Sequence, residues 1–217
     1  MRLRTLFFFM LLLTAFLLEA QEEYAWKLVK TNNDIKAYVK KNPNSKVRTV
    51  RVETITTATL SEVVSIIKDA GNHNKWVFVN NEACILESFD KYSWVYYGIS
   101  DLPWPVSDRD IITMVKLVQD TSDFTIYLKS TGVPHYLDEK EGFVRINDVV
   151  SEWRLNPIGN GTIHIAFELT LDVGGSIPLW FINLAVTKGP MQTMQGLLEM
   201  IESGDYKTHK LEYIREF

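Results

Sequence analysis

Cysteine is almost absent from this sequence: Cys84 is the only one among 217 residues. No internal disulfide can therefore form, even in an oxidising compartment, and the fold must be held together by its core. Cys84 lies in the apolar run ACIL, where a small buried side chain is its simplest role. Internal repeats, low-complexity segments and linkers rich in Pro, Gly and Ser are also lacking. A single domain is therefore predicted over residues 21–217.

Signatures of catalysis are equally scarce. The four histidines are scattered without the spacing of metal ligands, at His73, His135, His164 and His209. There is no nucleophile elbow and no phosphate-binding loop. We therefore expect a protein that is not an enzyme, with no catalytic residue, no metal and no cofactor.

Positive charge is in short supply as well. Once the first 20 residues are set aside, which contain two arginines and one glutamate, the 23 basic and 27 acidic residues fall to 21 and 26. This acidic balance argues against binding of nucleic acid. Segment 27–51 is the exception, since it has eight basic residues and only Asp34 as an acidic one. Two interpretations stay open: transient docking of this segment onto an anionic membrane surface, or a solvated strand whose lysines block edge pairing.

No apolar run has the length of a membrane-spanning helix. The longest, Leu6–Leu18, is interrupted only by Thr14 and covers about two-thirds of the roughly 20 residues that a spanning helix needs. Arginines precede this run, and Ala20 follows it before Gln21. The pattern predicts a signal peptide over residues 1–20, with an uncleaved anchor as the alternative. Both alternatives place residues 21–217 on the far side of a membrane, in a secreted or periplasmic location.

Periodicity indicates a hairpin followed by helix. Residues 34–42 (DIKAYVKKN) alternate between apolar and polar side chains, and 46–55 return as a second strand after the turn Asn42-Pro43-Asn44-Ser45. Residues 59–71 have helical spacing with Gly71 as the expected C-cap, and 73–79 suggest a further short turn of helix.

Strand-like runs and one long helix make up the rest of the chain. Runs rich in β-branched and aromatic residues occur at 83–89, 93–99, 110–118, 124–130, 144–155 and 162–171. Asn160-Gly161 predicts a tight hairpin turn, which accounts for the pair without invoking the glycosylation sequon Asn-Gly-Thr. Residues 176–203 predict an amphipathic helix that Gly189-Pro190 kinks or briefly interrupts. The predicted fold is therefore α+β: a curved antiparallel sheet wrapped around a long C-terminal helix, with short helices after the first hairpin.

Three stretches in this order resemble the START (StAR-related lipid-transfer) domain family, which has a helix-grip fold. They are WKLVKTNNDIKAYVKKNPNSKVRTVRVE at 26–53, PWPVSDRDII at 103–112 and GGSIPLWFINLAVTKGP at 174–190. The resemblance extends over about Trp26 to Ser203. It implies a tunnel between the sheet and the C-terminal helix that holds one lipid, covered by loops. Residues 101–107 correspond to the omega loop, at which members of the family open to exchange ligand.

Loop 101–107 raises a question, because prolines bracket apolar side chains in a segment that should be polar. Under the resemblance, Leu102, Trp104 and Val106 form a lid over an apolar cavity. The alternative is that Trp104 plugs an ordinary core. The charged residues at 108–110 are expected to anchor the loop through ion pairs and caps.

Strand parity and the resemblance together predict the residues that contact the lipid, with ordinary core packing as the alternative at each position. The set is Trp94, Tyr96, Leu102, Trp104, Val106, Ile111, Thr113, Val115, Trp153, Phe167, Leu169, Trp180, Leu184 and Met191. This assignment leaves no carboxylate, imidazole or guanidinium inside. Some START domains carry a charged pair in the strands that flank the omega loop, whereas the matching positions here are near Tyr96 and at Val115. That departure argues against a charged anchor and against sterol as the ligand.

We therefore expect a monomeric lipid-binding or lipid-transfer protein. The alternatives are a polyketide cyclase-like enzyme on the same scaffold, and an interaction domain whose pocket is filled by its own side chains.

Overall fold

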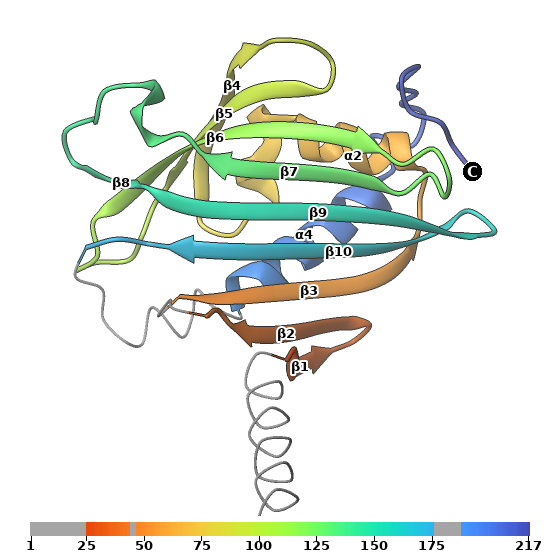
Figure 1. Ribbon diagram of the computed structural model, residues 1–217, viewed down its shortest axis with the longest axis horizontal. Helices are drawn as coiled ribbons and strands as arrows, with labels where there is room; N and C mark the ends of the chain where they lie inside the picture. Colours follow the sequence, from red (N-terminus) through yellow and green to blue (C-terminus); the bar gives the residue numbers. More distant parts are fainter. Residues whose placement is uncertain (1–24, 44–46, 176–187) are drawn as a thin grey trace, which may run out of the picture.

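A ten-stranded sheet makes up most of the molecule (Figure 1). The computed structural model describes residues 25–43, 47–175 and 188–217. Nine strands run antiparallel to their neighbours in the order β1-β2-β3-β10-β9-β7-β6-β5-β4. Their bounds are β1 Lys27–Asn32, β2 Ile35–Lys41, β3 Arg48–Thr57, β4 Asn80–Ser88, β5 Ser93–Ser100, β6 Asp108–Gln119, β7 Ile126–Gly132, β9 Asp148–Gly159 and β10 Thr162–Asp172. The predicted fold class, an antiparallel sheet with a closing helix, is confirmed.

The tenth strand, β8 (Phe143–Ile146), corrects the sequence prediction of one strand over 144–155. Asn147 interrupts that run, so that β8 and β9 are separate. β8 pairs in parallel with the first four residues of β6, Asp108 to Ile111. The reason is geometric: β7 pairs with β6 only from Thr113 onward, which leaves this part of the β6 edge open.

The turns follow the sequence chemistry where the structure describes them. Asn160 and Gly161 both have positive φ, 55° and 69°, as a two-residue hairpin turn between β9 and β10 requires. The predicted turn is therefore confirmed. β2 and β3 pair as the predicted hairpin up to Lys41 opposite Arg48, whereas residues 44–46 of its turn lie outside the described residues.

Helix α2 (Leu60–Lys68) follows β3, and the 3-10 helices η1 (Ala70–Lys75) and η2 (Pro134–Tyr136) complete the short helical elements. Thr59 caps α2 in a reciprocal arrangement with Glu62. The carboxylate of Glu216, near the end of the chain, accepts hydrogen bonds from the Leu60 and Ser61 N–H groups at 2.9 and 2.8 Å. The helix ends before the predicted C-cap Gly71, because the chain continues into η1.

Helix α4 (Gly189–Ser203) crosses one face of the sheet against β2, β3 and β10 (Figure 1). Its residues Met194 and Leu197 are fully buried, in the core between helix and sheet. The predicted helix over 176–203 is described only from Lys188, so residues 176–187 lie outside the described residues. As described, α4 begins at Gly189-Pro190, where the interruption was predicted.

Cys84 is exposed, which corrects its interpretation as a buried residue. It lies on β4, the last strand of the sheet path, where one side of the strand has no neighbouring strand among the described residues. No helix within 25–43, 47–175 and 188–217 has both the length and the apolar character to cross a membrane.

Candidate functional site

The helix-facing side of the sheet carries the side chains that form the candidate site. Strand pleating sends alternate residues to this face, and the register aligns them into rows across neighbouring strands. Trp94 on β5 lies opposite Val115 on β6, and Trp153 on β9 lies opposite Phe167 on β10. The rings of Trp153 and Phe167 stack with centroids 4.2 Å apart. The result is an apolar wall that runs across five strands, since Leu128 of β7 lines the same face between β6 and β9.

A cavity of about 260 Å³ lies against this wall. Nine of the predicted lipid-contact residues line it: Trp94, Tyr96, Leu102, Ile111, Thr113, Val115, Trp153, Phe167 and Leu169. The space predicted between sheet and helix is therefore hollow in part, rather than filled throughout by side chains. Contact of these residues with a lipid stays a prediction.

The remaining predicted residues do not line the described cavity. Met191 of α4 is buried in the hydrophobic core, and Val106 is buried without lining the cavity. Trp104 has 92 % of its surface exposed, so it neither plugs the core nor covers the cavity. Both inward interpretations of Trp104 are wrong, because the turn that holds Leu102 and Val106 inward directs the intervening side chain to solvent. Trp180 and Leu184 lie outside the described residues.

The second wall comes from the segment after η1 and from the start of α4. Trp76, Phe78 and the first turn of α4 line the cavity. The Phe78 N–H donates to the Thr193 hydroxyl at 3.1 Å. A Cβ on Gly196 would lie 2.5 Å from the Trp76 carbonyl oxygen, so only glycine permits this approach of helix to backbone. These contacts fix α4 against the segment that closes the cavity.

His73 corrects the prediction that the interior has no imidazole, because it lines the cavity and is 8 % exposed. Its Nε2 lies 2.9 Å from the Ile67 carbonyl oxygen, and its Nδ1 lies 3.2 Å from the Tyr96 hydroxyl. Burial lowers the pKa of His73 below its ordinary value. Burial also raises the pKa of Tyr96, so both groups are neutral near pH 7. η1 is too short and irregular for periodicity to predict which of its side chains point inward, so this position could not be found by spacing.

Arg109 corrects the prediction that the interior has no guanidinium. It shares the parity of Ile111 on β6, lines the cavity and is 3 % exposed. Its guanidinium donates to the carbonyl oxygens of Val173 at 3.4 Å and Gly174 at 3.2 Å, and to that of Ser107. Burial lowers its pKa from the ordinary value, yet an arginine stays charged. Arg109 therefore ties the end of loop 101–107 to the chain after β10.

Loop 101–107 is fixed at both ends by polar contacts. The Asp108 carboxylate accepts a hydrogen bond from the Leu102 N–H at 2.9 Å, and the Val106 N–H donates to the Pro103 carbonyl at 3.1 Å. The predicted anchoring role of residues 108–110 is confirmed for Asp108 as a cap. Leu102 is the residue of this loop that faces the cavity.

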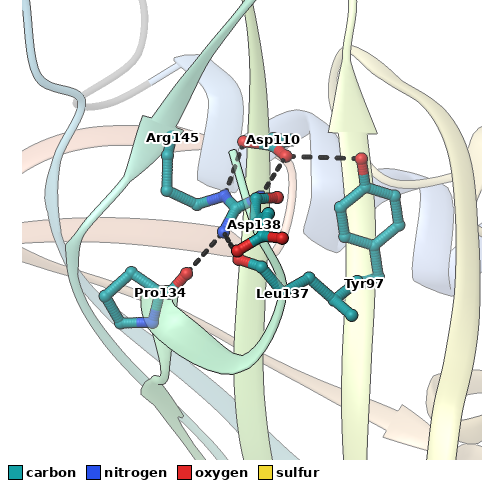
Figure 2. A network of polar contacts seen from close by, with 6 residues as sticks. All are labelled: Tyr97, Asp110, Pro134, Leu137, Asp138 and Arg145. Carbon is teal, nitrogen blue, oxygen red and sulfur yellow. Dashed lines mark hydrogen bonds and ion pairs between the residues drawn. The ribbon is translucent and has the colours of Figure 1, made fainter. Parts of the chain in front are cut away.

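Asp110 anchors the other face of the sheet, as Figure 2 shows. Both of its oxygens accept from Arg145 on β8 at 2.8 Å, and the Tyr97 hydroxyl donates to it at 3.3 Å. Arg145 also donates to the carbonyls of Pro134, Leu137 and Asp138. The network joins β5, β6 and β8 to the turn around η2, and its role is structural.

Metal chemistry has no ligand set here. Within the described ranges, no cluster of three or more His, Cys, Asp or Glu side chains could hold a metal ion. The lining that the structure describes is mostly aliphatic and aromatic, with one imidazole, one guanidinium and several hydroxyls. Such a site can bind an apolar molecule and hydrogen-bond to it at a few points.

Comparison with known proteins assigns the family. The family model of the START domain matches residues 11–203. The chain belongs to the START domain family. An uncharacterized protein of Pseudomonas aeruginosa is 31% identical to it over 177 residues, which cover 82% of this chain and 87% of that protein.

Solved START structures have the same fold. The StAR-related lipid transfer protein of Xanthomonas axonopodis superposes with a TM-score of 0.75 at 28% identity, over 82% of this chain and 98% of that one. Human StAR-related lipid transfer protein 5 gives a TM-score of 0.73 at 20% identity, over 88% and 93% of the two chains. START domains are generally lipid-binding.

Proposed function

We propose that this START domain binds one apolar lipid in the cavity between the sheet and α4, and carries it between membranes. The observation that supports this most directly is a cavity of about 260 Å³ lined mostly by apolar side chains. A carrier must offer a lipid chain an interior as dry as the bilayer, because each methylene moved out of water gains about 0.8 kcal/mol. The volume lies just below the roughly 300 Å³ at which ordinary ligand pockets begin, so one chain fits better than two.

Loop 101–107 is the proposed gate. It contributes Leu102 to the cavity wall, and it is held by the Asp108 cap and by the Arg109 bonds to Val173 and Gly174. Release of these few hydrogen bonds would move Leu102 away without disturbing any strand of the sheet. Exchange of the lipid through this opening therefore requires little reorganisation.

Location and membrane contact belong to the same proposal. The leader over residues 1–20 would direct the chain to a secreted or periplasmic location, where a lipid must cross water to reach another membrane. β1 is exposed along its whole length and carries Lys27 and Lys30, which suits contact with anionic headgroups. Other charges of segment 27–51 are engaged within the protein, since Arg51 lies over the Trp26 ring and 3.7 Å from Glu168. Unchanged binding to anionic liposomes after Lys27→Gln and Lys30→Gln would reject this contact.

Solvent extraction of the purified protein followed by mass spectrometry tests the carrier directly. A stoichiometric lipid supports it, and a protein that carries nothing favours an interaction domain. Transfer of a fluorescent lipid between vesicles supplies the functional measurement. Val115→Trp fills the cavity and should abolish transfer, whereas Val118→Trp on the exposed face of the same strand should leave it unchanged.

A cyclase-like enzyme is the second candidate, and one observation favours it. The hydrogen-bonded pair of His73 and Tyr96 lies inside the cavity, where an acid or base would have to act. Extraction distinguishes the two functions, because an enzyme would release an altered polar aromatic product whereas a carrier returns its ligand unchanged.

A further inference from the structure

Residues 77–80 form a tight turn in the cavity wall, between η1 and β4. The Asn80 N–H donates to the Val77 carbonyl at 3.1 Å, which closes the turn around Phe78 and Val79. All four residues line the cavity. The backbone conformation of this turn, called turn 77–80 below, therefore decides the shape of one part of the wall.

Val79 holds a conformation that valine rarely adopts. Its φ is 50°, in the left-handed region, and it is the third of the four turn residues. A positive φ at this position is the mark of a type II turn, which normally has glycine or asparagine there. The branched Cβ of valine crowds the backbone in this region, so the conformation is strained. Phe124 is the other bulky apolar residue with positive φ in the described part of the chain, and it does not line the cavity.

A strained residue keeps its conformation only where its surroundings hold it. The Val79 carbonyl accepts a hydrogen bond from the Asp101 N–H at 3.1 Å. Asp101 is the first residue of loop 101–107, which is the proposed gate. One of the contacts that maintain the strain therefore comes from the gate itself.

Helix α4 holds the turn from the other side. The Phe78 N–H donates to the Thr193 hydroxyl at 3.1 Å. The Phe78 ring also lies directly on the backbone of Gly189, where a Cβ would be 2.8 Å from the ring. Turn 77–80 is thus clamped between the first turn of α4 and the start of loop 101–107.

We propose that turn 77–80 is a strained latch, which opens together with loop 101–107 and relaxes at Val79 as it opens. The inference rests on the proposed function, because a latch in the cavity wall acts only on a ligand that enters and leaves. Movement of the loop separates the Asp101 N–H from the Val79 carbonyl, and Val79 is then free to return to negative φ. The closed state alone carries the steric cost, so the strain favours opening.

Valine, rather than the glycine expected in such a turn, produces this effect. Glycine adopts a positive φ without steric cost, so a glycine at position 79 would leave the closed turn unstrained. Only a free-energy difference between two states can shift their equilibrium, and the strain of Val79 is such a difference. Strain of this kind changes an equilibrium constant by about tenfold. The opened wall is therefore populated more often than it would be with glycine.

Amide hydrogen exchange measured by NMR on the full-length protein tests the latch without any ligand. The Phe78, Asn80 and Asp101 N–H groups each make a hydrogen bond that opening breaks. We expect Val79→Gly to raise the protection of these three amides by about tenfold, because it removes the strain of the closed turn. Val77→Gly is the matched control. It removes the same side chain from the same turn at a position without positive φ, and should not raise the protection.

Release of a bound probe tests the consequence for exchange of ligand. N-phenyl-1-naphthylamine, a neutral apolar fluorophore, would be loaded into the protein and its release followed by stopped-flow fluorescence. Val79→Gly should slow release by about tenfold, although it removes a side chain from the cavity wall. Thr193→Val removes the hydroxyl that accepts from the Phe78 N–H, and it should accelerate release. A residue that merely fills the wall would give the opposite result for Val79→Gly, because its loss would leave a hole.

The outcomes separate the latch from the carrier. Amide protection in Val79→Gly that is equal to or below that of wild type overturns the latch, whether or not the probe binds. Raised protection combined with unchanged or faster release also overturns it, since the turn would then open without controlling the ligand. A probe that fails to bind wild type counts against the carrier, and the amide measurement then decides by itself whether Val79 strains the closed turn.

Discussion

Asp110 on β6 and Arg145 on β8 form a bidentate ion pair whose side chains are only 1% and 3% exposed. β8 is four residues long and parallel to its neighbour, so its backbone ladder alone is short. The ion pair and the carbonyls that Arg145 also binds hold this strand in place (Figure 2).

Removing one partner of this pair should be strongly destabilising. Arg145→Met leaves the Asp110 carboxylate buried with only the Tyr97 hydroxyl as a side-chain donor, and we expect a loss of about 3–5 kcal/mol in the free energy of unfolding. Urea denaturation measures it, with the exposed Asp148→Asn as control. The double variant Asp110→Leu/Arg145→Met should recover much of the loss. Single variants within about 0.5 kcal/mol of wild type would contradict the finding.

Gly196 should tolerate no side chain. An alanine Cβ would lie 2.5 Å from the Trp76 carbonyl oxygen and 2.9 Å from its Cα, and these backbone atoms cannot move aside as a side-chain end could. We expect Gly196→Ala to lower stability by about 1–3 kcal/mol, despite the better helix propensity of alanine. Gly71→Ala is the matched control, since its nearest neighbour would be 3.8 Å away. Equal unfolding midpoints for the two variants would show that α4 is not packed this closely.

His73 should make stability depend on pH in the acid range. Its pKa is lowered from 6.5 chiefly by burial, against the opposing effects of the Ile67 carbonyl and Asp69. As pH falls below 6.5 the unfolded chain takes up a proton that the folded chain refuses. The free energy of unfolding therefore falls with pH, until the folded-state pKa is reached.

The comparison of variants isolates this contribution. Between pH 7 and 5, the free energy of unfolding should fall more steeply with decreasing pH for wild type than for His73→Gln. The exposed His135→Gln variant should follow wild type. Identical slopes in all three proteins would mean that His73 titrates as freely as in the unfolded chain.

Substitutions at Trp104 and Val106 in loop 101–107 should differ in their effect on the free energy of unfolding. Trp104 is 92 % exposed, so Trp104→Ser should change the free energy of unfolding by less than about 0.5 kcal/mol. Val106 is 7 % exposed, and Val106→Ser should cost about 1–3 kcal/mol, because it removes buried apolar surface and buries a hydroxyl. Thermal unfolding checks both. A large loss for Trp104→Ser would restore its interpretation as a core plug.

The sheet half of the site could be predicted from sequence because strand pleating is regular. Parity alone placed Ile111, Thr113 and Val115 on one face, and all three line the cavity. Arg109 has the same parity, so its inward position could also have been predicted. It was missed because its place in a charged run suggested an ion pair, whereas it bonds to backbone carbonyls.

The other wall could not be predicted, because irregular backbone has no period. His73 comes from a 3-10 helix and Trp76 and Phe78 from the segment that follows it, where spacing along the chain does not fix side-chain direction. The outward turn of Trp104 has the same origin. A tight loop decides each orientation separately, and its two prolines indicated only that the loop is stiff.

The pairing of β3 with β10 has a consequence for biosynthesis. Thr57 meets Thr162 in this ladder, so about a hundred residues separate the two strands along the polypeptide. In a nascent chain, the β3 edge of the first hairpin therefore stays unpaired until the residues of β10 have been translated. Closure of the sheet at this ladder therefore waits until β10 has been synthesised, and a message truncated before codon 162 would leave the β3 edge without its partner strand.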